Sequence, residues 1–193
     1  LYGKEYSHAT VMKRAIEEKL IDPRSSIQVG IRGSLPYPDD LERTRSLGIT
    51  VVTAEELSRR GVRDVAAEVL SRVGGKVYLT FDIDFVDPAY APGTGTPEVG
   101  GPSSREAIDL LRELKALPLV AFDLVEVSPP YDQAELTTML AANLIYEVLS
   151  ILAWHRSRGE PRDPDDRADG GPDVVPSPED TAPGTRADGQ PAA

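Results

Sequence analysis

The sequence contains no cysteine, only two histidines and a single tryptophan among its 193 residues. The absence of cysteine excludes disulfides, thiolate metal sites and a thiol nucleophile, so metal binding or catalysis must use oxygen and nitrogen groups. Basic residues are also scarce, because 21 Lys and Arg stand against 32 Asp and Glu, for a formal net charge of -11. Nucleic acids and anionic membranes bind clustered Lys and Arg. We therefore expect neither as a partner.

Long hydrophobic runs are missing as well. The most apolar stretch, 139–152, is interrupted by Asn143 and Glu147, and by this measure it is too short to cross a bilayer. The first residues show no pattern of positive charge followed by an apolar segment, as a secretory signal would. We expect a soluble, cytoplasmic protein.

The composition divides the chain into two parts. Residues 1–155 carry the apolar runs needed for one core, whereas residues 156–193 are rich in Pro, Gly and Asp. Ordering the second part would cost conformational entropy without burying apolar surface, so we expect a disordered tail. A solvated extension is the favoured reading of this tail, and a docking segment is the alternative.

Short apolar runs alternate with helical patterns before the tail, which is typical of βαβ units and a parallel sheet. Strands are predicted at 27–31, 49–52, 77–82 and 119–125. Helices are predicted at about 38–48, one or two within 55–73, one at 102–117 and one at about 134–154. Ser103 and Glu106 form a capping box at the start of the third helix. The last helix is apolar almost all round, so we expect it to be buried on several sides or to pack against another subunit.

The third strand ends in "FDID", which places Asp82 and Asp84 two residues apart. Strand alternation would turn both carboxylates to one face at the carboxyl edge of the sheet, where open α/β sheets carry their chemistry. Two such carboxylates repel each other unless a cation lies between them, and an all-oxygen pair suits Mg²⁺ or Mn²⁺. The alternative is structural, with one aspartate capping the loop and the other in water.

The loop that follows, "VDPAYAPGTGTPEVGG", has too many glycines and prolines for a plain connector. Together, "FDIDFVDPAYAPGTGTPEVGG" and "FDLVEVSPPYD" closely resemble successive signatures of the ureohydrolase family of arginases and agmatinases, the agmatinase-like branch in particular. "YSHATVMKRAIEEKLIDPRSSIQVGIRGS" resembles the family segment upstream of them. The resemblance implies an arginase-like three-layer α/β/α fold with a parallel sheet, incomplete at its N-terminal side.

The resemblance also implies roles for single residues. Asp82 and Asp84 match two ligands of a pair of Mn²⁺ ions, and the family's binuclear-manganese-activated hydroxide attacks the guanidinium carbon to release urea and an amine. The resemblance therefore also implies a catalytic role for Asp82. Glu126 matches the glutamate that binds the substrate guanidinium, for which a carboxylate has the right geometry. His8 aligns with the histidine that relays a proton to the leaving amine, although Ala9 follows it where the family more often has glycine.

The sequence departs from the family in one respect. The Gly-Gly-Asp-His and Asp-Ala-His-x-Asp elements that supply the other metal ligands do not occur here, and two aspartates cannot complete two metal sites. We expect the chain to be part of a longer enzyme and to be inactive alone. The alternative is a short, non-catalytic homologue that serves as a binding or assembly subunit.

The substrate expected from the loop wording "APGTGTPE" is agmatine, hydrolysed to putrescine and urea, with guanidinobutyrate or another guanidino acid as the alternative. Glu98 is a candidate for the specificity wall or for bracing the loop. A phosphatase of the haloacid dehalogenase type, with Asp82 as nucleophile and Asp84 as general acid, is disfavoured because that scheme leaves the Pro-Gly loop without a purpose. The family resemblance implies a homo-oligomer, trimeric or hexameric.

Overall fold

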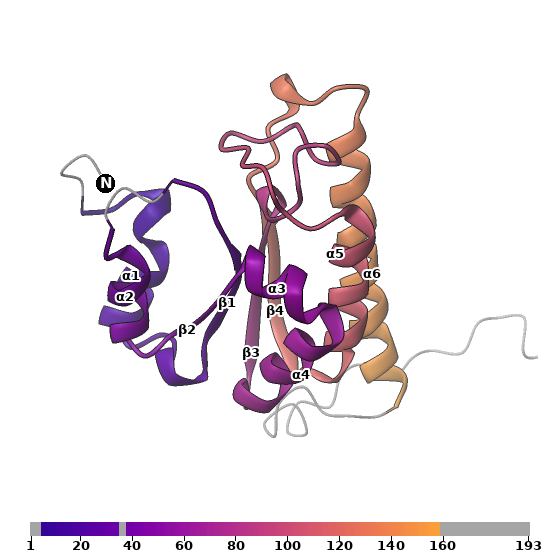
Figure 1. The fold of residues 1–193 in the computed structure, drawn as a ribbon. Coiled ribbons are helices and arrows are strands. Elements are labelled where there is room, and N and C mark those ends of the chain that lie inside the picture. Colours follow the sequence, from indigo (N-terminus) through magenta and orange to yellow (C-terminus); the bar gives the residue numbers. More distant parts are fainter. Residues whose placement is uncertain (1–4, 35–37, 159–193) are drawn as a thin grey trace, which may run out of the picture. The chain divides into compact units, whose positions relative to one another are not determined.

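The computed structural model describes residues 5–34 and 38–158. The strands are β1 (Ile27–Ile31), β2 (Thr50–Thr53), β3 (Val77–Asp82) and β4 (Leu119–Val125). The α-helices are α1 (Val11–Glu17), α2 (Asp40–Ser46), α3 (Ala54–Arg60), α4 (Val62–Arg72), α5 (Ser104–Glu113) and α6 (Leu136–Ser157). Short 3₁₀ turns occur at η1 (His8–Thr10), η2 (Pro23–Ser25), η3 (Ile83–Phe85), η4 (Leu114–Ala116) and η5 (Pro129–Tyr131). The alternation of strands and helices confirms the predicted α/β class (Figure 1).

All strand pairs are parallel, as predicted, but they form two ladders instead of one continuous sheet. β1 pairs with β2, and β3 pairs with β4. Side chains, and not backbone hydrogen bonds, join the two ladders, because Ile27 and Val29 of β1 pack against the core that β3 and β4 share with the helices. The β1–β2 register shifts between Val29 and Ile31, at Gly30, which has a φ of +92°. This irregularity lets β1 turn beside the residues that follow β3.

The helix ends follow local sequence signals. Ser103 and Glu106 form the predicted capping box at the start of α5, and Thr53 and Glu56 form a second one at the start of α3. Gly61, at a φ of +82°, separates α3 from α4, so the region expected to hold one or two helices holds two.

The main core lies between the β3–β4 ladder and the helices α4, α5 and α6. Figure 1 shows α5 and α6 side by side on one face of this ladder. The apolar face of α5 and η4 is buried: Ala107, Leu110 and Leu111 of α5 and Leu114 of η4 are all at most 7% exposed. Burial of these side chains is the main stabilising contribution to this half of the fold.

Helix α6 is longer than expected, and it continues to Ser157, into the first residues assigned to the tail. Residues 159–193, the rest of that predicted tail, lie outside the described residues. The expectation that no apolar segment is long enough to span a membrane is wrong by length and composition, since α6 has 22 residues and a mean hydropathy of 1.6. Yet Leu144 and Val148 are fully buried in the core, and Glu147 accepts a 2.9 Å hydrogen bond from Arg112 of α5. These contacts are those of a core helix.

Only one side of α6 is covered by the described residues, so among them the expectation of burial on several sides is not met. Met139, Tyr146 and Leu149 on its outer side are 64%, 69% and 56% exposed. The face of β3–β4 opposite α5 and α6 is also open in the described part of the chain, where Tyr78 and Val125 are 45% and 38% exposed. Parallel sheets are usually covered on both faces.

We expect the chain by itself to associate through these open apolar surfaces. Light scattering coupled to size exclusion should give a mass above that of a monomer, rising with concentration. Leu149→Lys should lower the measured mass, because it places a charge on the outer side of α6, whereas Lys13→Glu on the exposed surface of α1 should not. A monodisperse monomer of the unchanged chain would contradict this expectation.

Candidate metal and guanidinium site

Asp82 is the last residue of β3, and Asp84 follows it in the 3₁₀ turn η3. Alternation along an extended strand, the basis of the sequence argument, therefore stops at Asp82. Ile83 between them is fully buried and anchors the turn in the core. The turn leaves Asp82 exposed and Asp84 half-buried at the carboxyl end of the strand. The two aspartates thus occupy the predicted edge, but through a turn.

Asp82 is partly desolvated and lies among other carboxylates. Partial burial and the neighbouring carboxylates of Asp84, Glu126 and Asp123 raise the pKa of Asp82 to about 6. Asp123 itself is satisfied, since Thr80 donates a 2.6 Å hydrogen bond to it and the Tyr78 hydroxyl donates another. Asp82 has no such hydrogen-bond donor among the described residues. A bound cation would stabilise the charged form of the Asp82 carboxylate.

Asp84 is fixed from two directions. The Thr96 hydroxyl donates a 2.6 Å hydrogen bond to its Oδ2, and Arg32 donates one of 2.6 Å to its backbone carbonyl oxygen. Thr96 was not singled out from the sequence, because it lies twelve residues away in an irregular loop. These contacts leave Oδ1 of Asp84 free of described protein donors, so it can serve a ligand.

Glu126 directly follows β4 and has a φ of +66°, a left-handed conformation that is strained for a residue with a side chain. Its side chain is exposed, and its charge contributes to the raised pKa of Asp82. Residues 86–101, here called the glycine loop, lie beside Glu126, since a Cβ built on Gly95 would lie 4.0 Å from Glu126 Oε2. The structure thus places Glu126 with Asp82 and Asp84 at one end of the β3–β4 ladder.

Asp87, the third aspartate of the motif, closes the loop and was given no role from the sequence. Its carboxylate accepts hydrogen bonds from the backbone N–H groups of Ala89, Gly100 and Gly101, at 2.9, 2.8 and 3.2 Å. The bond from Ala89, with those from Gly100 and Gly101, lowers the pKa of Asp87. Asp-Pro at a loop start is typical of such turns and was the available signal.

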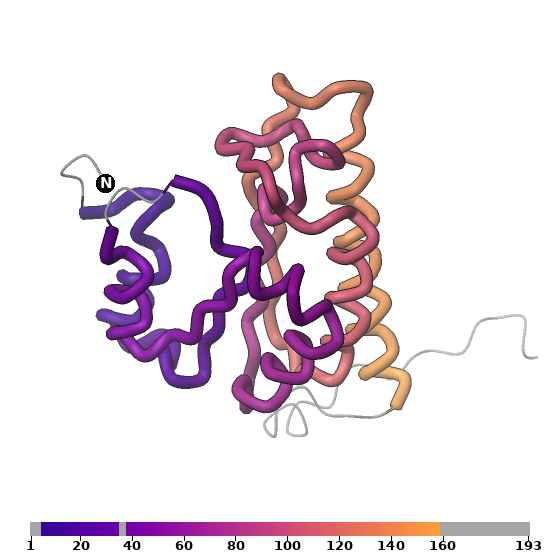
Figure 2. Tube along the Cα trace, in the orientation of Figure 1, coloured from indigo at the N-terminus to yellow at the C-terminus, as the bar shows by residue number. Residues whose placement is uncertain are grey.

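A second set of contacts ties the glycine loop to the start of α6, as the adjoining segments in Figure 2 illustrate. Gly93 donates a 2.7 Å hydrogen bond from its N–H to the hydroxyl of buried Thr137, and Ser128 donates one of 2.8 Å to the Gly93 carbonyl oxygen. Asp132 accepts the N–H groups of Thr137 and Thr138 at 2.9 and 2.8 Å. Partial desolvation alone would raise the pKa of Asp132, but these hydrogen bonds outweigh it and lower that pKa to about 2.

His8 is the one predicted site residue that the structure does not bring to this cluster. It begins the turn η1 near the N-terminus, its side chain is exposed, and no hydrogen bond or ion pair links it to the three acidic residues in the described part of the chain. Its role as a proton relay stays a prediction. Glu98, the other candidate, contributes its backbone carbonyl oxygen to Arg32.

Metal ligation by the described residues is partial. Asp82 and Asp84 supply carboxylate oxygens of the type that Mn²⁺ accepts, but residues 5–34 and 38–158 hold no group of three or more Asp, Glu or His side chains arranged around one ion. The donor set therefore fits two ligands of a site that needs further ligands.

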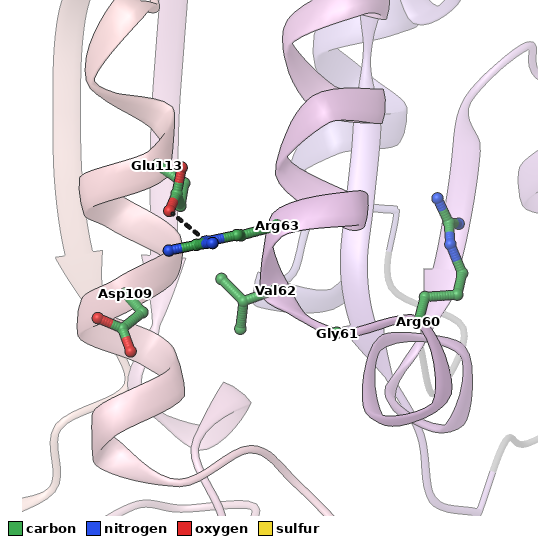
Figure 3. A pocket seen from close by; sticks show the side chains of 6 residues that line it. All are labelled: Arg60, Gly61, Val62, Arg63, Asp109 and Glu113. Carbon is green, nitrogen blue, oxygen red and sulfur yellow. Dashed lines mark hydrogen bonds and ion pairs between the residues drawn. The ribbon is translucent and has the colours of Figure 1, made fainter.

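One of the cavities on the molecule, about 370 Å³ in volume, lies away from these residues. It is lined by the junction of α3 and α4 and by α5, with Arg60, Gly61, Val62, Arg63, Asp109 and Glu113 around it (Figure 3). Arg63 donates a 3.3 Å hydrogen bond to Glu113 across it. None of the predicted site residues lines this cavity.

The geometry defines a parallel α/β protein with an acidic, cation-seeking cluster at the carboxyl end of a strand. The family model of the arginase family matches residues 1–150, and the chain belongs to the arginase family. This confirms the ureohydrolase resemblance. The structure of proclavaminate amidino hydrolase from Streptomyces clavuligerus superposes with a TM-score of 0.74 at 47% identity, covering 78% of this chain and 50% of that one. The predicted arginase-like fold is thereby confirmed.

Relatives with different substrates in their names are about equally similar. A guanidinopropionase from Pseudomonas aeruginosa is 47% identical over 79% of this chain and 48% of its own length. An agmatinase from Enterobacter sp. (strain 638) is 49% identical over 78% of this chain and 47% of its own length. The chain spans about half the length of the curated relatives that it matches.

Proposed function

We propose that this chain carries part of a binuclear manganese centre that hydrolyses a guanidino compound to urea and an amine. The observation that carries the proposal is the convergence of Asp82, Asp84 and Glu126 at one end of the β3–β4 ladder, where partial desolvation and the acidic neighbours raise the pKa of Asp82 to about 6. Such unbalanced negative charge in a structured loop is typical of a cation site. The family membership and relatives named for amidino and guanidino hydrolysis support the same reaction class.

Asp82 and Asp84 would hold the metal ions, which when bound lower the pKa of water and so provide a nucleophile at neutral pH. Thr96 and the backbone contacts of Arg32 keep the Asp84 carboxylate oriented. Glu126 would accept two N–H groups of the planar guanidinium and set its carbon against the metal-binding aspartates. Its left-handed backbone, at a φ of +66°, is a strain of the kind that occurs at functional sites.

Within this reaction class we propose agmatine as substrate, as the loop "APGTGTPE" indicates, with guanidinobutyrate or another guanidino acid as the alternative. The similar identities to an agmatinase and to a guanidinopropionase support guanidino hydrolysis without separating these substrates. We also propose a cytoplasmic homo-oligomer. The open outer side of α6 supports self-association.

The test is urea release in Mn²⁺, with agmatine, 4-guanidinobutyrate, 3-guanidinopropionate or arginine in parallel, by a protein that joins this chain to a segment supplying the remaining metal ligands. We expect agmatine to give the highest rate once all metal ligands are present, and Glu126→Gln to lower kcat/KM at least about 100-fold, because one carboxylate oxygen that accepts from the guanidinium is lost. Glu113→Gln, a matched change on α5, should leave the rate unchanged. Mn²⁺ binding by that protein with no urea from any substrate would favour the non-catalytic homologue.

A further inference from the structure

Arg32, the residue after β1, connects three segments that are far apart in the sequence. Its guanidinium donates hydrogen bonds to the carbonyl oxygens of Asp84 at 2.6 Å and Glu98 at 2.7 Å, and its Nε donates a second one to Glu98 at 3.2 Å. Longer contacts reach the carbonyl oxygens of Gly30 at 3.3 Å and Val86 at 3.4 Å. A single half-buried side chain thus connects the end of β1 to both ends of the segment 84–98.

Among the described residues, the acceptors of Arg32 are all backbone carbonyl groups, and none forms an ion pair with it. This pattern uses the fixed fan of guanidinium donors, and a lysine ammonium at the same place could not reach oxygens in so many directions. Partly buried carbonyl groups that lose their donor incur a desolvation cost, so the loop depends on this side chain for its conformation.

The sequence keeps space for the guanidinium. A Cβ on Gly101 would lie 2.6 Å from Arg32 Nη2 and 2.8 Å from the backbone nitrogen of Asp87. A Cβ on Gly33 would lie 2.5 Å from Cδ of the Glu98 side chain. Main chain therefore packs against both the Arg32 guanidinium and the segment that it holds, so these contacts are enclosed on two sides.

We propose that Arg32 is a positioning residue, which holds the main chain of Asp84 and Glu98 so that the Asp84 carboxylate stays beside Asp82. The chain of contacts runs from the Arg32 guanidinium to the Asp84 carbonyl, while Thr96, two residues before Glu98 in the same loop, fixes the Asp84 carboxylate. The metal-related part of this inference rests on the proposed function. The loop-ordering part does not.

Two readouts on the whole chain test the proposal. The first is hydrogen exchange of residues 84–101 without metal, and the second is the Kd for Mn²⁺ followed by electron paramagnetic resonance. We expect Arg32→Met to speed exchange in this loop but not in α5, and to weaken Mn²⁺ binding about 10- to 100-fold, as loss of an outer-shell partner does. The loop exchange rate and the Kd of Arg32→Lys should lie between those of Arg32→Met and those of the unchanged chain. Arg63→Met, at an arginine with a 91% exposed side chain, is the matched control.

The outcomes separate the two proposals. Unchanged loop exchange in Arg32→Met would overturn the inference that Arg32 orders the loop. Faster loop exchange with an unchanged Kd would overturn the role of Arg32 in positioning Asp84 as a ligand. If the unchanged chain binds no Mn²⁺, the proposed function fails, and loop exchange alone still decides whether Arg32 orders the loop. If Arg32→Met does not fold, Arg32→Lys supplies both readouts, and a Kd and loop exchange equal to those of the unchanged chain would overturn the proposal.

Discussion

Asp82→Asn is expected to shift the stability of the chain in opposite directions with and without manganese. Without metal, partial desolvation and the acidic neighbours raise the pKa of Asp82 above its ordinary value, to about 6, so the charged form destabilises the folded state. That cost is absent at low pH, develops as the pH rises from about 4 to about 6 and stays constant above. Asn carries no charge, so the variant should be more stable than the unchanged chain at pH 7 to 8, by about 1 kcal/mol after allowance for solvent screening.

With Mn²⁺ the order should reverse. The unchanged chain should gain stability as it binds the ion, whereas the variant should lose most of its affinity, because an amide oxygen is a much weaker ligand for Mn²⁺ than a carboxylate. The affinity of the unchanged chain should also fall as the pH drops through about 6, where protons compete for Asp82. Thermal unfolding at pH 5 and pH 8, with and without Mn²⁺, measures both effects.

The matched control is Asp64→Asn, which makes the same change of charge on α4, where Asp64 pairs with Arg60 at 2.6 Å. It should not gain stability between pH 5 and 8, and it should keep the response to Mn²⁺. An Asp82→Asn variant that is stabilised by Mn²⁺ as strongly as the unchanged chain would show that Asp82 is not a ligand.

Gly30→Ala is expected to have the largest effect on folding. Gly30 lies at the shift in register between β1 and β2 with a φ of +92°, which side chains rarely adopt. A Cβ there would also lie 2.5 Å from Cε2 of Phe85, which is closer than van der Waals contact allows, and the Phe85 ring packs edge-on against Phe81. Strain and steric overlap together should lower the free energy of unfolding by about 3 kcal/mol or more.

The comparison for Gly30→Ala is Gly74→Ala in the connection between α4 and β3. A Cβ on Gly74 would meet no heavy atom within 4 Å, and Gly74 has no positive φ. Urea denaturation should therefore show a large loss for Gly30→Ala and a change within about 0.5 kcal/mol for Gly74→Ala. Equal stability of the two variants would mean that the junction of β1 and η3 is not closely packed.

Local sequence signals were sufficient for most of the elements. The predicted bounds of β1, β3 and β4 are confirmed, because short apolar runs between turn residues determine them, and the capping box places the start of α5. The division into two ladders could not be predicted, since it depends on side chains of β1 packing against a distant core. The length of α6 was underestimated because apolarity ends at Trp154, whereas the helix continues through charged residues to Ser157.

The candidate site divides along the same lines. Asp82 ends β3, Asp84 lies two residues beyond it and Glu126 directly follows β4, so spacing and family resemblance were enough to select them. Arg32 and Thr96 act through contacts of 66 and 12 residues in sequence separation, and Asp87 acts through main-chain groups of its own loop. No periodic pattern reports such contacts. They depend on where the irregular loop places its carbonyl and hydroxyl groups.

The most direct test is a crystal structure of this chain in Mn²⁺, with anomalous scattering recorded for manganese. An anomalous peak coordinated by the carboxylates of Asp82 and Asp84 is the predicted result. Ordered aspartates without any such peak, at a Mn²⁺ concentration that saturates the binding curve, would contradict the metal site on which the proposed reaction depends.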